Sequence, residues 1–398
     1  MFSFWENKSF KKYDYIIVGA GITGLSTAAS LVEKNPKAKI AVLERGFLPT
    51  GASTKNAGFA CFGSLSEIAS DLETMSETEL TDLVTNRLQG LEKLRNRLGD
   101  TKIGYKNYGG YELILDKQIP YIEQLDKVNQ LLQPVFNGQN VFKTKDGLIE
   151  GFGFNARHVR RIVYNRFEGQ IHTGKMMKSL LNYVQKRGVT IFTGCEVIGF
   201  EDLTNHADSL NGQEGKNKVI VKIKNPLHTE GSNFSDIELI ASKVAICTNA
   251  FTKKLIPDLD LQAGRGQVLV TKPLNNLRFK GTFHLDEGFY YFRNFGRRII
   301  LGGGRNMDFE GETTTKLETT ELILEDLKSK LSDIIIPKQK FEIDTTWAGI
   351  MAFTETSKTK IPLLQNYSKN IVLGVRLGGM GVALGSKLGE EIAEMMGS

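Results

Sequence analysis

The hydrophobic pattern at the start of the chain predicts a strand, a helix and a second strand. Residues 13–19 (YDYIIVG) and 39–44 (KIAVLE) are short apolar runs that predict buried strands. Between them, residues 22–34 place their apolar side chains at helical spacing. A strand–helix–strand unit of this length requires a parallel sheet. The chain therefore begins with a β-α-β unit.

The rest of the chain alternates between segments of helical and strand periodicity. Ser76 and Glu79 have the spacing of a capping box, which predicts a helix that ends at Gly99. Other helices are expected at about 118–133, 174–187, 317–331 and 382–396, and strands at 111–115, 189–194, 219–223, 243–248, within 265–304 and at 370–375. Polar, Gly/Asn/Ser-rich residues 203–235 predict surface hairpins around the strand at 219–223. This order predicts one α/β domain assembled from separate segments, with a second, β-rich domain inserted.

Composition excludes several classes of protein. The 398 residues are 40% hydrophobic and 24% charged, typical of a soluble protein large enough for two domains. The net charge of +6 is scattered without a Lys/Arg-rich stripe, so we expect no nucleic-acid binding. Three widely spaced cysteines indicate neither a disulfide framework nor a metal site, and favour the cytoplasm. We expect no signal peptide, because the start MFSFWENKSFKK lacks an apolar core and a small-residue cleavage site. We expect no membrane span, because the apolar run at 15–32 is rich in glycine and small residues.

A glycine fingerprint follows the first predicted strand. Gly19, Gly21 and Gly24 match GxGxxG at the start of the helix, and Glu44 ends the next strand, 25 positions after Gly19. The first glycine permits a tight turn, the second lets the backbone approach a pyrophosphate, and the third lets helix and strand pack closely. The helix N-terminus favours the anion, and Glu44 can accept hydrogen bonds from ribose hydroxyls. This pattern predicts a dinucleotide site but does not distinguish NAD from FAD.

Two further segments of small residues favour the longer dinucleotide. Residues 45–58 form a polar loop directly after the ribose acid, where it can wrap the far half of FAD. Residues 374–383 are glycine-rich and precede an amphipathic helix, which provides a second helix N-terminus. A helix end of this kind stabilises the negative charge of a reduced flavin.

Seven segments in order resemble the FAD-dependent D-amino-acid oxidase, glycine oxidase and sarcosine oxidase family, with the gamma-glutamylputrescine oxidase-like branch the most similar. The resemblance covers nearly the whole chain. The matching segments are GAGITGLSTA (19–28), GASTKNAG (51–58), GQIH (169–172), CTNA (247–250), YFR with LGGG (291–293 and 301–304), WAG (347–349) and GGMGV (378–382). Lys55, Met380 and Thr173 stand where the family usually has Arg, His and Pro. No cysteine follows Trp347 where relatives with covalent flavin have one, so the resemblance implies noncovalent FAD.

The resemblance implies a Rossmann-type FAD-binding domain with an inserted α+β substrate domain on a mainly antiparallel sheet. We assign residues 1–90, 165–255 and 346–398 to the FAD domain, and 91–164 and 256–345 to the substrate domain. The residues expected to bind FAD are Gly19, Gly21, Ile22, Thr23, Gly24, Glu44, Arg45, Gly51, Ala52, Ser53, Lys55, Asn56, Ala57, Gly58, Val197, Thr248, Asn249, Ala250, Gly379, Met380, Gly381 and Val382.

The reaction that the resemblance implies is hydride transfer from the carbon bearing a neutral amine to flavin N5. Water then hydrolyses the imine, and oxygen or an electron carrier reoxidises the flavin. Arg293 and Tyr291 share one face of a predicted strand and could clamp a substrate carboxylate, although a solvated charge is also possible for Arg293. Lys55 could act near flavin N5, or instead contact an FAD phosphate or solvent.

The remaining candidates have weaker support. Arg265, Trp347 and Arg376 could each serve the site or only the fold, and His172 is expected to be structural at a helix entry. Two alternative functions stay open beside an amine or amino-acid oxidoreductase. They are an NAD(P)-dependent dehydrogenase and a flavin-binding subunit of a larger complex.

Overall fold

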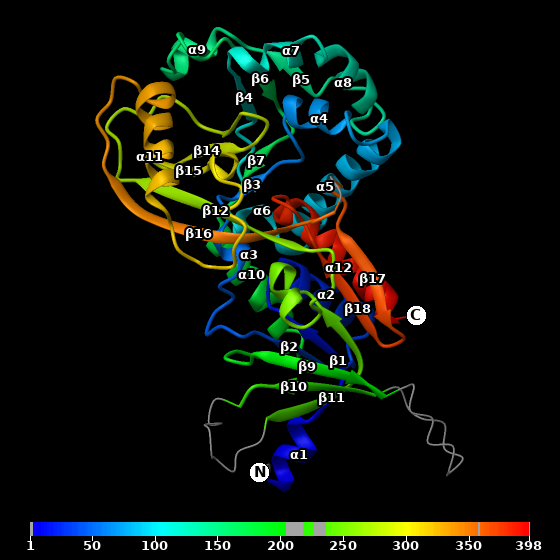
Figure 1. Cartoon of the computed structure of the whole chain (residues 1–398). Helices are drawn as coiled ribbons and strands as arrows, with labels where there is room; N and C mark the ends of the chain where they lie inside the picture. The colour runs from blue at the N-terminus through cyan, green and yellow to red at the C-terminus, as the bar shows by residue number, and fades with distance from the viewer. Residues whose placement is uncertain (1–2, 204–217, 226–235, 357–358, 398) are drawn as a thin grey trace.

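The computed structural model has two lobes, each built on its own sheet (Figure 1). It describes residues 3–203, 218–225, 236–356 and 359–397. Much of the hairpin region expected at 203–235 therefore lies outside the described residues.

The first sheet has the strand order β17-β18-β11-β1-β2-β8. From β18 to β8 all neighbours are parallel, β17 is an antiparallel edge strand, and β10 and β9 extend from β11. All residues of β2 and β18 and the last three residues of β1 and β11 are buried, which explains the nearly continuous apolar sequences of these parallel strands. The bounds are β1 (Lys12–Val18), β2 (Ile40–Leu43), β8 (Thr190–Phe192), β9 (Val197–Asp202), β10 (Val219–Ile223), β11 (Ile237–Ile246), β17 (Leu363–Ser368) and β18 (Ile371–Val375).

The second sheet has the order β16-β12-β15-β14-β13-β4-β6-β5, and only the β13–β4 pair is parallel. This confirms the expected combination of a Rossmann-type domain and a mainly antiparallel substrate domain. The bounds are β4 (Gly110–Ile114), β5 (Phe142–Thr144), β6 (Arg161–Asn165), β12 (Gln262–Thr271), β13 (Thr282–Leu285), β14 (Tyr290–Phe295), β15 (Arg298–Gly303) and β16 (Ile343–Phe353).

Helices cover both sheets. Four of them share one hydrophobic core on the first sheet: α2 (Ile22–Lys34), α5 (Glu77–Leu98), α10 (Thr173–Gln185) and α12 (Gly381–Gly397). Two pack on the second sheet with separate cores: α8 (Leu125–Leu132) and α11 (Glu321–Lys330). The shorter elements are α1 (Phe4–Phe10), α3 (Ala52–Lys55), β3 (Phe59–Ala60), α4 (Leu65–Asp71), α6 (Asp100–Ile103), α7 (Ile119–Ile122), α9 (Leu148–Phe152), β7 (Gly169–Gln170) and η4 (Arg305–Met307).

Two sequence expectations differ from the structure. The helix expected at 118–133 is divided into α7 and α8 by a break at Glu123 and Gln124. Pro120 lies in the first turn of α7, where its missing N–H is tolerated. Three assigned domain boundaries fall inside elements: 90/91 inside α5, 164/165 inside β6, and 345/346 inside β16, which pairs along its length with β12 of the second sheet. The described part of the chain contains no helix long and apolar enough to cross a membrane.

Small residues allow the first and last long helices to touch. A Cβ on Gly389 of α12 would lie 2.7 Å from the Ser26 Cβ atom and 2.8 Å from the Thr23 carbonyl oxygen of α2. Nearby, the Ser26 and Ser386 hydroxyls are 3.3 Å apart and share a hydrogen bond. This close contact brings the N-termini of both helices to the same end of the first sheet, as Figure 1 shows for α2 and α12.

A buried carboxyl group ties α4 to the second sheet. Glu112 on β4 accepts hydrogen bonds from the Ser64 hydroxyl (3.1 Å), the Ser66 backbone N–H (3.2 Å) and the Ser66 hydroxyl. Burial raises the pKa of Glu112 to about 7, because desolvation penalises its charged form more than these donors stabilise it.

We expect Gly389→Ala to destabilise the protein by about 1–3 kcal/mol, the usual range for overpacking. The added methyl group must displace α12 from α2, since backbone atoms lie within 2.8 Å of its position. Thermal unfolding measures the loss. Gly151→Ala in α9 is the control, because no atom lies within 4 Å of its added Cβ. Equal melting midpoints for the two variants would contradict the close contact.

Glu112 should make stability fall as the pH rises. Its folded pKa of about 7 exceeds the usual 4.5, so its stabilising contribution is complete below pH 4.5 and is lost as the pH rises through 7. We expect the melting midpoint of Glu112→Gln to change less between pH 4.5 and 8 than that of the wild type. Parallel curves for the two proteins would show that Glu112 does not titrate in this range.

Candidate active site

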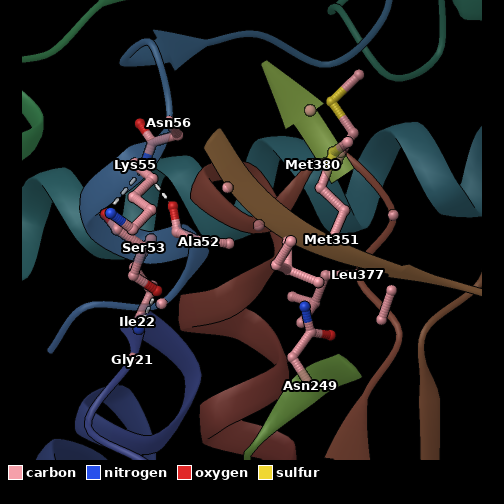
Figure 2. A pocket seen from close by; sticks show the side chains of 18 of the residues that line it. Gly21, Ile22, Ala52, Ser53, Lys55, Asn56, Asn249, Met351, Leu377 and Met380 are labelled. Atoms are coloured by element: carbon pink, nitrogen blue, oxygen red, sulfur yellow. Dashed lines mark hydrogen bonds between the residues drawn. The ribbon is translucent and has the colours of Figure 1, made fainter. Parts of the chain in front are cut away.

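One cavity of about 550 Å³ extends from the carboxyl ends of β1 and β2 to the second sheet. Most of the predicted cofactor residues line it, as do Tyr291 and Lys55. Gly24, Gly58, Ala250 and Arg293 do not line it. Figure 2 shows Lys55, Ser53 and Ala52 on one side of the pocket, opposite Met351, Leu377 and Met380.

The glycine fingerprint forms the turn between β1 and α2. Gly19 has φ +103°, and a Cβ there would lie 2.8 Å from the carbonyl oxygen of Cys247. A Cβ on Gly24 would lie only 2.0 Å from the carbonyl oxygen of Gly19. Glycine is therefore required at both positions, and Gly24 acts by close packing instead of lining the cavity.

The N-terminus of α2 opens onto the cavity. The N-cap residue of α2 is Gly21, which has no side chain to block the helix end. The N–H of Ile22 donates to the Ser53 hydroxyl at 2.9 Å (Figure 2). Gly21 and Thr23 line the cavity beside it. Free N–H groups and the helix dipole make this end suitable for a phosphate.

Glu44 is held in place at the end of β2. Its buried carboxylate accepts the N–H groups of Ala20 (3.1 Å) and Gly46 (2.9 Å). A carboxylate has about four acceptor sites, so two remain for hydroxyl groups of a ligand. The next residue, Arg45, stacks on Phe251 with its guanidinium carbon 3.6 Å from the ring centre, and it also lines the cavity.

The loop after Glu44 positions Lys55 between the two sheets. Asn56 closes this loop by donating to the Ser53 carbonyl (2.8 Å) and accepting from the Gly58 N–H (2.9 Å). The Trp347 indole donates to the carbonyl oxygen of Lys55 at 2.8 Å, so Trp347 supports Lys55 from β16. Among the residues that the structure describes, none forms a hydrogen bond or ion pair with the Lys55 ammonium group.

The C-terminal glycine segment forms the opposite wall. Gly379, Met380 and Gly381 line the cavity where α12 begins. Arg376 has φ +65°, and its guanidinium donates to Asp260 at 3.0 Å. Its backbone N–H donates to the Asn249 side chain at 3.1 Å. Although Arg376 lines the cavity, its hydrogen bonds connect the turn after β18 with the segments at Asn249 and Asp260.

Tyr291 presents its side chain from β14 to the cavity. Its ring lies over Gly302, where a Cβ would come within 2.7 Å of the ring, and it packs edge-on against Phe59. Burial raises the pKa of Tyr291 to about 12, so the phenol stays neutral and can donate a hydrogen bond. No described residue accepts or donates a hydrogen bond at this hydroxyl.

Arg293 does not face the cavity, where the sequence pattern predicted that it binds a substrate carboxylate. Its guanidinium is buried and donates to the carbonyl oxygens of Gly58 (3.0 Å) and Ile171 (2.7 Å). It shares a sheet face with Tyr291, but the loop at Gly58 lies between it and the cavity, which it does not line. The contacts therefore correct the expectation: Arg293 positions the Gly58 loop. Arg265 is similarly occupied, by a buried ion pair with Glu312 at 2.6 Å.

Two polar features of the cavity wall were absent from the sequence analysis. Arg305, directly after the glycines at the end of β15, lines the cavity. Glu67 and His284 also line it, and His284 lies 3.1 Å from Glu168 and 3.8 Å from Glu67. The Ser64–Glu67 capping-box spacing was a detectable sign of α4, but no local pattern predicts that Glu67 faces the cavity.

These residues fit FAD. One end of the cavity is surrounded by the N-terminus of α2, the hydrogen-bonded carboxylate of Glu44 and the loop at 45–58. The other end reaches the second sheet. His172, by contrast, caps α10 by accepting the Lys175 N–H, as its structural assignment predicts. Among the described residues there is no group of three or more side chains that could hold a metal ion.

Comparison with solved structures shows the same fold. L-proline dehydrogenase from P. horikoshii superimposes with a TM-score of 0.72 at 15% identity, covering 97% of this chain and 93% of that chain. Glycine oxidase from Geobacillus kaustophilus gives 0.72 at 17% identity, covering 97% and 95%. L-amino acid deaminase from Proteus myxofaciens, solved with anthranilate, gives 0.72 at 15% identity, covering 97% and 90%.

Sequence comparison identifies the family. Glucose oxidase from Penicillium chrysogenum is 36% identical over an alignment of 198 residues that covers 46% of this chain and 30% of that relative. The chain thus aligns with less than a third of this curated relative. The family model described as "DAO: FAD dependent oxidoreductase" matches residues 14–395. The chain therefore belongs to the DAO family of FAD-dependent oxidoreductases, which confirms the resemblance inferred from its motifs.

Proposed function

We propose that the protein oxidises the carbon–nitrogen bond of an amine or amino acid. The observation that carries the proposal is the single cavity that joins the dinucleotide cradle at Gly19 and Glu44 to the second sheet at Tyr291. A cofactor held at one end and a substrate held at the other would meet near Lys55. The cavity volume of about 550 Å³ is in the range of ordinary ligand sites, roughly 300–1,000 Å³.

The cradle residues would hold FAD through its phosphates and ribose. The N-terminus of α2 favours the pyrophosphate, Glu44 accepts from ribose hydroxyls, and the N-terminus of α12 favours negative charge on the flavin. When bound, FAD supplies the two-electron acceptor for a hydride. Burial raises the pKa of all three cavity-lining thiols, Cys61, Cys195 and Cys247, that of Cys247 to about 12, which disfavours the thiolate form that would attack a flavin. We therefore keep the prediction of noncovalent FAD.

The substrate end is built to orient a polar molecule. The Tyr291 hydroxyl and the Arg305 guanidinium both face the cavity without a partner among the described residues. Since Arg293 is occupied by backbone carbonyls, Arg305 replaces it as the proposed partner of a substrate carboxylate. An aromatic ring flanks each of these polar groups, since Phe59 packs edge-on against Tyr291 and the Arg305 guanidinium carbon lies 4.3 Å from the centre of the Phe353 ring.

The decisive experiment is anaerobic bleaching of the purified protein. We expect a yellow protein whose colour is released by acid precipitation and bleached by at least one compound among glycine, D-amino acids, N-methyl amino acids, proline and polyamines. A yellow protein that no amine bleaches would favour a flavin-binding subunit of a larger complex. A colour that stays with the precipitated protein would overturn noncovalent binding.

Lys55→Met separates two roles for the unpartnered ammonium group. If Lys55 promotes the reaction with oxygen, the bleached variant should regain its colour in air at least roughly tenfold more slowly, since a preorganised charge of this kind contributes a few kcal/mol. Its FAD affinity should stay within about threefold of wild type. Stopped-flow absorbance and fluorescence titration measure the two quantities.

The matched control for Lys55→Met is Lys254→Met, which removes another cavity-lining cation. Lys254 lies near Glu196, at the dinucleotide end of the cavity. A normal return of colour with weakened FAD binding in Lys55→Met would instead assign Lys55 to a phosphate of FAD.

A further inference from the structure

Two opposite charges face the substrate end of the cavity without neutralising each other. Arg305 follows β15, and Glu67 is in the first turn of α4. Both line the cavity, and no ion pair connects them within the described residues. The buried Nε of Arg305 has no partner among the described residues, and a buried charge of this kind costs free energy unless a ligand supplies the opposite charge.

Arg305 is oriented by aromatic rings instead of by a carboxylate. Its guanidinium carbon lies 4.3 Å from the centre of Phe353 and 5.2 Å from that of Phe309. The buried Nε atom has no hydrogen-bond partner, and burial lowers the pKa of the group. Opposite, a Cβ on Gly264 would lie 2.9 Å from Nε, so glycine provides the necessary space. A planar, unpaired guanidinium of this kind suits a carboxylate.

Glu67 keeps one carboxylate oxygen free for a cation. Oε2 accepts the Ser64 N–H at 3.0 Å and lies 3.8 Å from His284 Nδ1. Oε1 has no hydrogen-bond partner among the described residues. Burial opposes ionisation of Glu67, but the charges of His284 and Lys360 outweigh it and lower the pKa of Glu67. Gly288 has φ +79° and leaves space beside the Glu67 carboxylate, since a Cβ on Gly288 would lie 2.5 Å from the Glu67 carboxyl carbon.

The cations around Glu67 have other partners. Lys360 pairs with Asp71 at 2.6 Å, and His284 pairs with Glu168 at 3.1 Å. Burial opposes protonation of His284, but Glu168 and Glu67 raise its pKa to about 9, so it is a cation at neutral pH. Arg87 donates to the Phe62 carbonyl. Asp71 and Glu168, which pair with Lys360 and His284, do not line the cavity. The charged residues that line it around Glu67 are Glu287, Arg87, His284 and Lys360.

An apolar surface separates the two charges. Phe289 follows Gly288, the neighbour of Glu67, and its ring centre lies 5.8 Å from that of Phe309. Phe309 in turn contacts Arg305. Phe289 and Phe309 both line the cavity, so an aromatic surface connects the strand end beside Glu67 with the guanidinium of Arg305.

We propose that the substrate is a diamino carboxylic acid, whose carboxylate binds Arg305 and whose second, non-reacting ammonium group binds Glu67. Methylene groups between them would pack against Phe289 and Phe309. Hydride loss requires a neutral amine, whereas an ionised carboxylate favours the ammonium form of an amine beside it. The amine at Glu67 is therefore not the one oxidised. This inference rests on the proposed amine oxidation.

The experiment is anaerobic flavin reduction of the holoprotein by compounds that differ by one group. DL-Lysine and DL-ornithine retain both charges, DL-norleucine and DL-norvaline lack the distal amine, and cadaverine lacks the carboxylate. We expect the diamino acids to half-saturate at concentrations at least roughly tenfold lower than their monoamino analogues, because a charge-assisted hydrogen bond is lost in the latter.

Glu67→Gln should remove this preference, and Arg305→Met should weaken both classes of amino acid alike. Glutamine still supports a capping box, so α4 should fold, and thermal unfolding checks this. Glu79→Gln is the matched control, since it makes the same change at the same position of the α5 capping box, on the exposed surface.

Each outcome has one meaning. Equal efficiency of diamino and monoamino acids would overturn the proposed substrate class and leave amine oxidation standing. A preference that persists in Glu67→Gln would overturn the role of Glu67. Bleaching by cadaverine as readily as by DL-lysine would overturn the role of Arg305. If no amine bleaches the wild type, the proposed function itself fails.

Discussion

The close contact between α2 and α12 determines where the cavity forms. Glycine and serine side chains let the two helices approach until backbone atoms touch. Their N-termini then open onto the same space at the carboxyl ends of β1 and β2. Two helix dipoles directed at one cavity favour an anionic ligand more than either would alone. The ends of the chain, more than 350 residues apart in sequence, thus build one cofactor site.

Pairing of buried charges distinguishes supporting residues from residues that face a ligand. Arg265, Arg293 and Arg376 all lie near the site, but each guanidinium already donates to the protein: Arg265 to Glu312, Arg293 through Nη1 to two backbone carbonyls, and Arg376 to Asp260. Lys55, Arg305 and Glu67 keep free donors or acceptors on the cavity wall. An unsatisfied polar group in a cavity wall raises the free energy of the folded protein. A ligand that pairs with Lys55, Arg305 or Glu67 would offset this cost.

Local features of the site could be predicted from sequence, and long-range ones could not. The turn at Gly19, the capping box at Ser76 and the strand containing Tyr291 depend on neighbouring residues alone. Strand alternation also placed Tyr291 and Arg293 on one face. Only Tyr291 lines the cavity, because Arg293 is bound to the loop at Gly58. This loop lies more than 230 residues before Arg293 in the sequence.

The sequence by itself determined the dinucleotide cradle, because it arises from fixed spacings of glycine, acidic and apolar residues. The FAD family and its two-domain fold followed from the resemblance of seven ordered segments. Only the tertiary structure decided which charged residues face the substrate. Arg265, Arg293 and Arg305 are equally basic in sequence, and Glu67 and Glu79 occupy the same position of similar capping boxes. What separates them is burial and the presence or absence of a partner, and both depend on segments brought together from distant parts of the chain.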